Sequence, residues 1–305
     1  MFEKIYDLFG WILPQRHAFD NLIIVCRNLF ADGLAPKRIL ASLMVIVELF
    51  ISAIFKTPQP AMGQQLDLSN YELVIEDEFE GDELNLDIWE HRAEGARRSG
   101  FNAASQAKVK NGNLYLTGEY LENGAYGEGW YAGMIALKEH PCKGYFEIRC
   151  ICSDSDDFWS AFWIQADHPY DHYLSDGGIG GAELDIFEAM SADAKLKSNR
   201  EAVTSTIHCN GVDDDIENID SRQVGTFKVK DLYTKYNTFG LEWTDDEYIF
   251  YINGVESARS SFGKGVSQVP EQVILSLEIP SGGIQQDKDY KKEFIVDYVR
   301  IYKQK

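Results

Sequence analysis

The sequence has few basic residues for its length. Its 305 residues include 29 Lys and Arg against 49 Asp and Glu, which gives a formal net charge of −20 at pH 7. A protein that binds nucleic acid needs a basic surface, so this composition argues against nucleic acid as a partner. The same charge favours a neutral ligand over an anionic one, unless a local basic patch overrides it.

Zinc-binding cysteine patterns are also absent. The five cysteines include no C-x-x-C pair, so a structural zinc site has little support. Cys150 and Cys152 alternate along an expected strand and point the same way, which places them poorly for a bond with each other. A disulfide elsewhere in the globular part stays an open alternative.

Long apolar runs are missing apart from one near the N-terminus. Residues 39–55 (ILASLMVIVELFISAIF) form this run, which is interrupted by Glu48. Lys37 and Arg38 precede it, and Ala61-Met62-Gly63 could supply the cleavage site of a secretory signal. A helix that spans a bilayer wants about 20 apolar residues and disfavours a central Glu.

We therefore expect residues 1–63 to be a separate N-terminal segment that directs export. It would act as a cleaved signal or as a membrane anchor formed by residues 39–55. The protein would then be secreted or membrane-anchored, facing the extracellular or periplasmic space. A buried helix of the globular domain is the alternative interpretation of the same run.

Residues 64–305 contain no long helical period and no internal repeat. Short apolar runs alternate with Gly, Asn and Asp, and Asn253-Gly254 and Asn111-Gly112 indicate hairpin turns. This pattern favours an all-β antiparallel sandwich as the domain 64–305. The expected strands are Leu73–Ile75, Leu114–Thr117, Tyr145–Cys152, Ser160–Gln165, Glu183–Ala189, Ala202–Cys209, Thr238–Trp243, Tyr248–Ile252, Gln272–Ile279 and Phe294–Tyr302.

The stretch Glu183-Leu184-Asp185-Ile186-Phe187-Glu188 has an unusual pattern of acids. Alternate side chains of a strand share a face, which puts Glu183 with Asp185 and leaves Glu188 on the opposite face. A β-bulge with one extra residue after Asp185 would return Glu188 to the carboxylate face, and bulges are common beside active sites. A helix would spread the acids around its axis, so the pattern favours a bulged strand.

Three crowded carboxylates resist simultaneous ionisation, which raises the pKa of one of them. The group then contains a proton donor and an ionised partner, the two roles that glycoside hydrolysis requires. A site for a cation such as calcium and a solvated strand face are the alternatives at this point.

Aromatic residues on either side of the acids support a carbohydrate site. Sugar rings present C–H faces that stack on aromatic planes. Trp159 and Trp163 differ by four positions and would share one face of a strand, where one of them could contact a sugar. Trp130 and His208 are further candidate substrate contacts, and His208 could also join a proton network. We expect Trp243 in the core.

These segments resemble glycoside hydrolase family 16. The acids have the E-x-D-x-x-E form of that family's laminarinase-like and agarase-like branches. The resemblance covers about residues 71–303. The other matching segments, in the family's order, are Asp77–Gly81, Leu86–Trp89, Gly144–Arg149, Trp159–Trp163, Phe239–Thr244 and Val296–Tyr302.

The resemblance implies a concanavalin A-like β-jelly roll with a concave substrate cleft and a retaining mechanism. Glu183 would be the nucleophile, Glu188 the acid and then the base, and Asp185 the residue that tunes Glu183. No cofactor is implied for catalysis. Asp297 and the carbonyl of Gly112 match positions where many members bind a structural calcium, with an ordinary surface Asp as the alternative.

The resemblance also implies an endo-acting hydrolase of a polysaccharide, and we expect a monomer. A β-1,3- or β-1,3-1,4-glucan is the first choice. Agar- or carrageenan-type galactans stay open, because the segment before Glu183 lacks the Trp of many β-glucan-cleaving members. A non-catalytic carbohydrate-binding protein is the alternative from another class, although such relatives have typically lost the carboxylates. Transglycosylation by the same residues also stays open.

Overall fold

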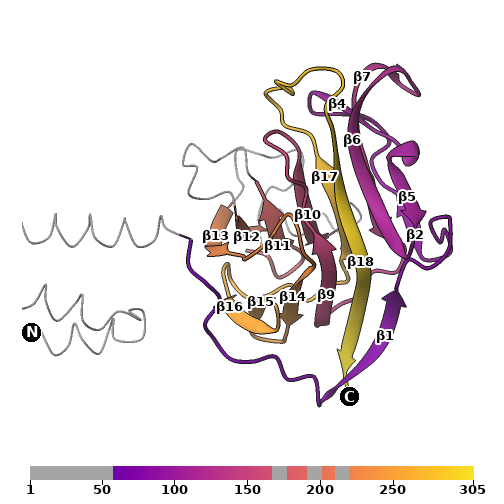
Figure 1. Cartoon of the computed structure of the whole chain (residues 1–305). Coiled ribbons are helices and arrows are strands. Elements are labelled where there is room, and N and C mark those ends of the chain that lie inside the picture. The colour runs from indigo at the N-terminus through magenta and orange to yellow at the C-terminus, as the bar shows by residue number, and fades with distance from the viewer. Residues whose placement is uncertain (1–57, 167–176, 191–200, 210–219) are drawn as a thin grey trace, which may run out of the picture. The chain divides into compact units, whose positions relative to one another are not determined.

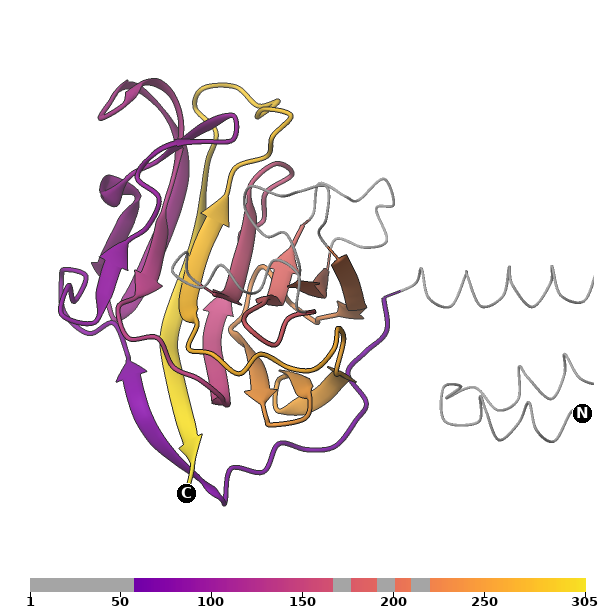
Figure 2. The ribbon, with the colours of Figure 1, turned by 180° about the vertical axis from the view of Figure 1, so that it is seen from behind.

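The computed structural model describes residues 58–166, 177–190, 201–209 and 220–305, which form two stacked β-sheets (Figures 1 and 2). The predicted all-β sandwich is confirmed. Short apolar strands reach this architecture because each sheet buries one face against the other. Of the expected N-terminal segment 1–63, residues 1–57, which include the apolar run 39–55, lie outside the described residues. Within them, no helix has the length and apolar character to cross a membrane.

The smaller sheet has seven strands and contains the acid-rich stretch. Its neighbours are antiparallel throughout. The strand order is β13 (Asp220–Lys228), β12 (Ala202–Cys209), β11 (Glu183–Ala189), β10 (Trp159–Gln165), β17 (Gln272–Glu278), β8 (Met134–Leu137) and β2 (Trp89–His91).

The larger sheet has eleven strands and packs against the smaller one. β1 (Tyr71–Asp77) pairs with β18, and β5 (Ala107–Lys110), which follows the short helix η1 (Ala104–Gln106), pairs with β6. The order of the other strands is β16 (Val255–Ser260), β15 (Tyr248–Ile252), β14 (Asn237–Trp243), β9 (Gly144–Ile151), β18 (Lys291–Gln304), β6 (Asn113–Gly124), β7 (Gly127–Ala132), β4 (Gly100–Asn102) and β3 (Gly95–Arg97).

The core lies between the two sheets. Phe187 of β11 is fully buried, and its ring centroid lies 4.1 Å from that of Phe239 in β14. Trp243 is 1% exposed, which confirms its predicted place in the core. Truncation of one such ring to Ala costs about 3–5 kcal/mol, so these contacts fix how the smaller sheet sits on the larger one.

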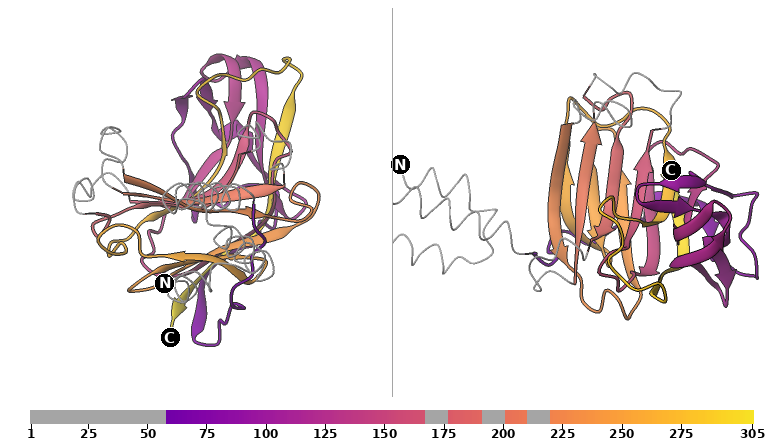
Figure 3. Two further views of the ribbon diagram at one scale, coloured as in Figure 1. Left: turned by 90° about the vertical axis from the view of Figure 1, so that its left-hand side faces the viewer. Right: turned by 90° about the horizontal axis from the view of Figure 1, so that it is seen from above.

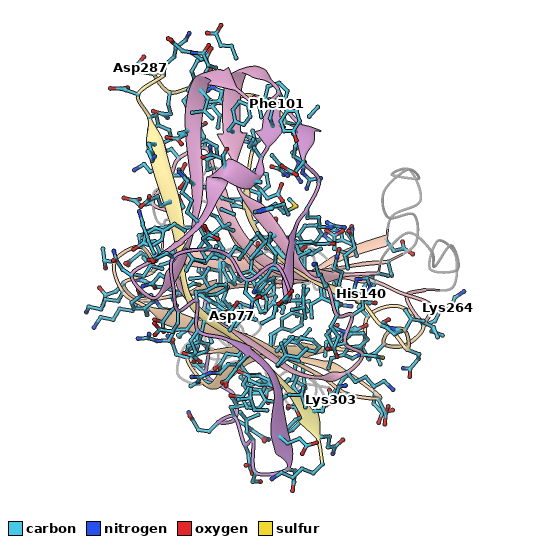
Figure 4. The ribbon with its side chains drawn as sticks, turned by 90° about the vertical axis from the view of Figure 1, so that its right-hand side faces the viewer. Asp77, Phe101, His140, Lys264, Asp287 and Lys303 are labelled. Atoms are coloured by element: carbon cyan, nitrogen blue, oxygen red, sulfur yellow. The ribbon has the colours of Figure 1, made fainter. Side chains whose placement is uncertain are left out.

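One end of the larger sheet projects past the smaller sheet on the smaller sheet's outer side (Figure 3). We call this part the projecting wall; it comprises β3, β4, β6, β7 and the loop 280–290. Phe101 and Asp287 lie near its far end (Figure 4). The turn between β3 and β4 also contacts the smaller sheet, because Arg97 and Arg98 bind Glu278 of β17.

Residues 58–68, which we call the arm, run along the other side of the sandwich (indigo in Figure 1). Gln59 forms a bridge with Phe227 of β13, and Gln65 forms one with Val255 of β16. Because β13 and β16 are edge strands of different sheets, the arm joins the two edges.

The hairpin predictions are confirmed at the backbone. Asn253 and Gly254 connect β15 to β16 with φ of 51° and 74°, and Asn111 and Gly112 connect β5 to β6 with φ of 54° and 68°. Positive φ at both turn residues is what Asn-Gly supplies. No disulfide joins the described cysteines, at positions 142, 150, 152 and 209.

Candidate active site

Strand β11 contains the predicted bulge. Opposite β12, Asp185 pairs with Thr206, whereas Glu188 pairs with Thr204. Three steps along β11 therefore correspond to two along β12, and the register with β10 shifts at the same place. The extra residue returns Glu188 to the face of Glu183 and Asp185.

The bulge is stabilised from both sides. Leu184 and Phe187 are fully buried in the core and hold β11 against the larger sheet. The hydroxyl of Ser205 donates to the carbonyl of Ile186 over 2.8 Å, so the carbonyl displaced from the ladder keeps a partner. We call the outer face of the smaller sheet, with its three acids, the carboxylate face.

Glu188 has the properties of a proton donor. Burial raises its pKa to about 8, and the neighbouring charges of Asp185 and Glu183 act in the same direction. The indole N–H of Trp159 donates to Glu188 Oε1 over 3.0 Å and partly offsets this rise. At neutral pH Glu188 therefore holds a proton beside two other carboxyl groups.

Glu183 is held at the other end of the carboxylate face. The amide of Gln165 donates to Glu183 Oε2 over 2.6 Å, and Arg92 donates to the carbonyl oxygen of the same amide over 2.8 Å. Because its oxygen already accepts from Arg92, the Gln165 amide must turn its N–H toward Glu183. These two bonds fix the orientation of the Glu183 carboxylate.

Asp185 lies between the two glutamates and contacts His208. His208 Nε2 is 3.1 Å from Asp185 Oδ2, and its Nδ1 is 2.6 Å from the hydroxyl oxygen of Ser221. Burial lowers the pKa of His208, but the Asp185 contact and the charges of Glu183 and Glu188 together raise it above its ordinary value. The imidazole is thus part of the network of acids, as the sequence suggested.

One subset of this network also has the geometry of a metal site. Glu183, Asp185 and His208 each place one ligand atom within 4.8 Å of the others. Two carboxylates and an imidazole suit several divalent metals. Among the described residues, the cation interpretation of the acids therefore stays open beside catalysis.

Trp159 and Trp163 lie on the carboxylate face, as predicted, but their rings are covered. They are 8% and 6% exposed. The guanidinium of Arg98 lies 4.8 Å over the Trp159 ring, and that of Arg92 lies 5.1 Å over the Trp163 ring. A ligand would therefore meet the two arginines before it met the indole faces.

The arginines were missed at the level of sequence. Arg97 and Arg98 bind Glu278, which is 4% exposed, at 3.1 and 2.7 Å. An adjacent Arg-Arg pair in a chain of net charge −20 was the available signal. The sequence alone does not show that this pair lies at the site, because Arg97 and Arg98 are far in sequence from their partner Glu278.

Trp130 and the predicted calcium residues lie elsewhere. Trp130 packs edge-on against three aromatic rings, at positions 120, 158 and 290, and belongs to the cluster between the sheets rather than to that of Trp159 and Trp163. These contacts give no support to its role as a substrate contact.

Asp297 is ion-paired with Arg149. Gly112 has the carboxylate of Glu80 close by, since a Cβ built on the glycine would lie 3.7 Å from Glu80 Oε1. Calcium takes about six to eight oxygen ligands. Asp297 and Gly112 offer few of these, and the one carboxylate is already paired, so the structural calcium stays a prediction.

A family model described as "Beta-porphyranase A-D, GH16 domain" matches residues 74–304. The match covers well over half of the chain, and the chain belongs to glycoside hydrolase family 16. The predicted family is confirmed. No curated protein matches the chain.

Solved structures of the family have the same fold. SCLam, described as a non-specific endo-β-1,3(4)-glucanase, has a TM-score of 0.64 at 22% identity and covers 82% of this chain and 98% of its own. LamAcat from Zobellia galactanivorans has a TM-score of 0.61 at 17% identity, covering 82% and 99%. The laminarinase catalytic domain from Thermotoga maritima has a TM-score of 0.60 at 18% identity, covering 78% and 100%. At these identities the likeness concerns the fold.

Proposed function

We propose that this protein is a retaining endo-glycoside hydrolase that cleaves a sulfated galactan of the porphyran type. The proposal of hydrolysis rests on one observation: Glu188, whose pKa is raised to about 8, shares the bulged face of β11 with Glu183 and Asp185. A protonated and an ionised carboxyl on one face are the two groups that glycoside hydrolysis requires.

The mechanism uses the two glutamates in turn. A carboxylate oxygen of Glu183 attacks the anomeric carbon while Glu188 gives its proton to the departing glycosidic oxygen, and a glycosyl-enzyme ester forms. Glu188, now ionised, takes a proton from water, whose oxygen attacks the same carbon and releases Glu183. His208 contacts Asp185, and its protonated imidazole moderates the repulsion among the three acids, whose charges raise the pKa of His208.

The substrate class is supported by the family model and by the arginines. Porphyran is a galactan that carries sulfate esters, and a guanidinium binds such an anion through paired N–H donors. Arg92 and Arg98 cover the tryptophans of the carboxylate face, so they supply the local basic patch that an acidic chain needs for an anionic polymer. The neighbours with glucanase names are at most 22% identical and do not bear on the substrate.

The test is the release of reducing ends from porphyran, agarose, carrageenan, laminarin and lichenan. Glu183→Gln and Glu188→Gln serve as controls that keep the shape of each side chain but remove its charge or its proton. We expect activity on porphyran that Glu183→Gln abolishes and that Glu188→Gln lowers by about 10²–10⁴-fold. Retention of the anomeric configuration in the first product, followed by NMR, checks the mechanism.

The other outcomes point to specific alternatives. Activity confined to laminarin or lichenan would establish a β-glucanase and refute the role given to the arginines. Binding of a polymer without cleavage would establish a carbohydrate-binding protein. Activity that survives Glu183→Gln would refute the assignment of the nucleophile.

We also propose that the protein is exported. An enzyme that cleaves a large polysaccharide meets its substrate outside the cytoplasm, and the basic pair Lys37-Arg38 followed by the apolar run 39–55 fits a signal or an anchor. Fractionation of the producing cell tests this, since a cytoplasmic full-length protein would refute export. The mature N-terminus separates cleavage from anchoring.

A further inference from the structure

Glu271 is a buried acid that the proposed mechanism does not use. It is 0% exposed and precedes β17 directly. Side chains alternate along a strand, so Glu271 points into the core on the same side as Val273 and Leu275. Its Oε1 accepts the backbone N–H of Ala182 over 2.9 Å. Its Oε2 is buried as well, and the side chain of Ser267 interacts with the same carboxyl group.

Ala182 is the residue before Glu183, at the entrance to β11. Its carbonyl accepts the N–H of Ala166 over 3.0 Å, which continues the pairing of β10 with β11. The N–H bond to Glu271 fixes the same peptide from the core side. The position of the Glu183 backbone is therefore set by these two contacts and by the ladder that begins with Glu183 itself.

The chain before Ala182 has little stiffness of its own. Gly177, Gly178 and Gly181 have φ of 80°, 97° and 141°, a region that glycine enters at low cost. The segment 264–271 holds this glycine-rich stretch from outside. The N–H of Lys264 donates to Gly177 over 3.0 Å, and that of Gln268 donates to Ile179 over 2.9 Å. Glu271 is the last contact of this series, next to the acids.

Burial of a carboxyl group at this position is energetically unfavourable. Burial raises the pKa of Glu271 to about 8, and the charge of Glu183 adds to the rise. Tyr248 of β15 and Cys142 also face the group and are affected by its charge. A buried carboxyl group is less favourable here than an apolar residue of the same size, even with its contacts to Ala182 and Ser267. Such local violations of good packing are expected where function requires them.

We propose that Glu271 is a positioning residue, which holds the Ala182 amide and thereby places Glu183 for attack on the anomeric carbon. The inference rests on the proposed role of Glu183 as nucleophile. Glu271 does not touch the substrate, because it lies on the core side of the sheet whose other side carries the acids. Its effect is on the geometry of the attack and not on the affinity for the polymer.

The experiment compares four variants of the full chain on the polymer that the wild type cleaves. Glu271→Gln keeps an oxygen that can accept from Ala182, and Glu271→Met fills the volume without one. Glu271→Asp keeps the carboxyl but is one methylene too short to reach Ala182. Val273→Ala is the matched control, since it perturbs the same core-facing row without touching Ala182. For each variant we would measure kcat, KM and Tm.

We expect kcat of Glu271→Met and Glu271→Asp to fall by about 10- to 100-fold at unchanged KM, because small misplacements of reacting groups cost that much. Glu271→Gln should rescue kcat to within about threefold of the wild type. Val273→Ala should lower Tm while its kcat stays that of the wild type. If Glu271→Met does not fold, the comparison of the Asp and Gln variants decides the question.

Two results would overturn the proposal. In one, Glu271→Met and Glu271→Asp lower Tm as Val273→Ala does but leave kcat unchanged, which makes Glu271 structural only. In the other, Glu271→Gln loses as much kcat as Glu271→Asp, so that acceptance from Ala182 does not matter. Failure of the proposed function has a different signature, namely activity that survives Glu183→Gln in the same assay.

Discussion

The indole N–H of Trp159 donates to Oε1 of Glu188 across neighbouring strands, over 3.0 Å. This bond stabilises the ionised form of Glu188 and so opposes the effect of burial, which raises the pKa to about 8. Trp159 therefore limits how strongly Glu188 holds its proton. The tryptophan acts on the acid directly, whatever sugar contacts it makes.

Trp159→Phe should move the alkaline limb of kcat/KM to higher pH. The wild-type limb should lie near pH 8, where Glu188 loses the proton that the leaving group needs. Without the indole N–H the ionised form loses a donor, and the pKa rises further. A pH series of initial rates measures this, with Trp163→Phe as the control, since Trp163 binds Ser276 instead. A limb that moves to lower pH would contradict the assignment.

Glu188 also predicts how stability depends on pH. Its folded pKa of about 8 lies above the ordinary value of 4.5, so the folded protein binds the proton more tightly. This contribution to stability is fully present below pH 4.5 and is lost as the pH rises to about 8. Glu188→Gln stays neutral, and its Tm should exceed that of the wild type at pH 9 but not at pH 4.5. Thermal melts at both pH values measure the difference, and an equal gap at both would refute it.

The contact of His208 with Asp185 should have a pH dependence of the same sign. The pKa of His208 is raised above its ordinary 6.5, so the pair contributes stability that is fully present below about pH 6.5. That contribution is lost as the pH rises through the raised value. His208→Gln should therefore lower Tm more at pH 5.5 than at pH 9, and it should lower kcat because Asp185 loses a partner. Melts and rates at the two pH values check both effects.

The sequence allowed the acid strand to be predicted because its information is local. Side chains alternate along a strand, so few arrangements place all three acids on one face and the two core residues on the other. A bulge after Asp185 is one that does. Glu183–Ala189 and Ala202–Cys209 were predicted with the bounds that the structure shows. Other strands were not predicted, such as β13, whose residues 220–223 are all exposed, so that no apolar alternation marks it.

The residues that surround the acids could not be found in this way. Gln165 binds Glu183, Arg92 binds Gln165, and Glu271 binds Ala182. These residues come from three other segments, and only the fold brings them together. Trp130 lies on β7 of the larger sheet and packs against Phe158, the residue before Trp159. Its role as a substrate contact stays a prediction.

The arginines that cover the tryptophans should govern how the enzyme responds to salt and sulfate. If Arg92 and Arg98 bind sulfate esters, KM for porphyran should rise with ionic strength, because salt screens exposed charges. Arg98→Lys keeps the charge but loses the planar guanidinium that stacks on Trp159 and pairs with Glu278. We expect it to raise KM about 3- to 10-fold on porphyran, and less on the desulfated polymer. Equal effects on the two polymers would mean that Arg98 only supports Trp159.

Removal of the arm should destabilise the protein at a place far from the acids. Gly63 donates to Glu256 over 2.8 Å, and Gln59 donates to Thr226 over 3.1 Å, so the arm pairs with an edge strand of each sheet. A protein that begins at residue 69 would expose both edges, and unpaired edge strands promote association. We expect its Tm to fall by several degrees, since each 1 kcal/mol shifts Tm by about 2–4 °C at this size.

A protein that begins at residue 58 is the control and should melt several degrees higher. Because the arm pairs with β13 and β16, and β12 separates β13 from β11, kcat of the shorter form at 20 °C should equal that of the control. Light scattering during the melt tests the exposed edges, and equal Tm values for the two forms would show that the arm is not needed to close the sandwich.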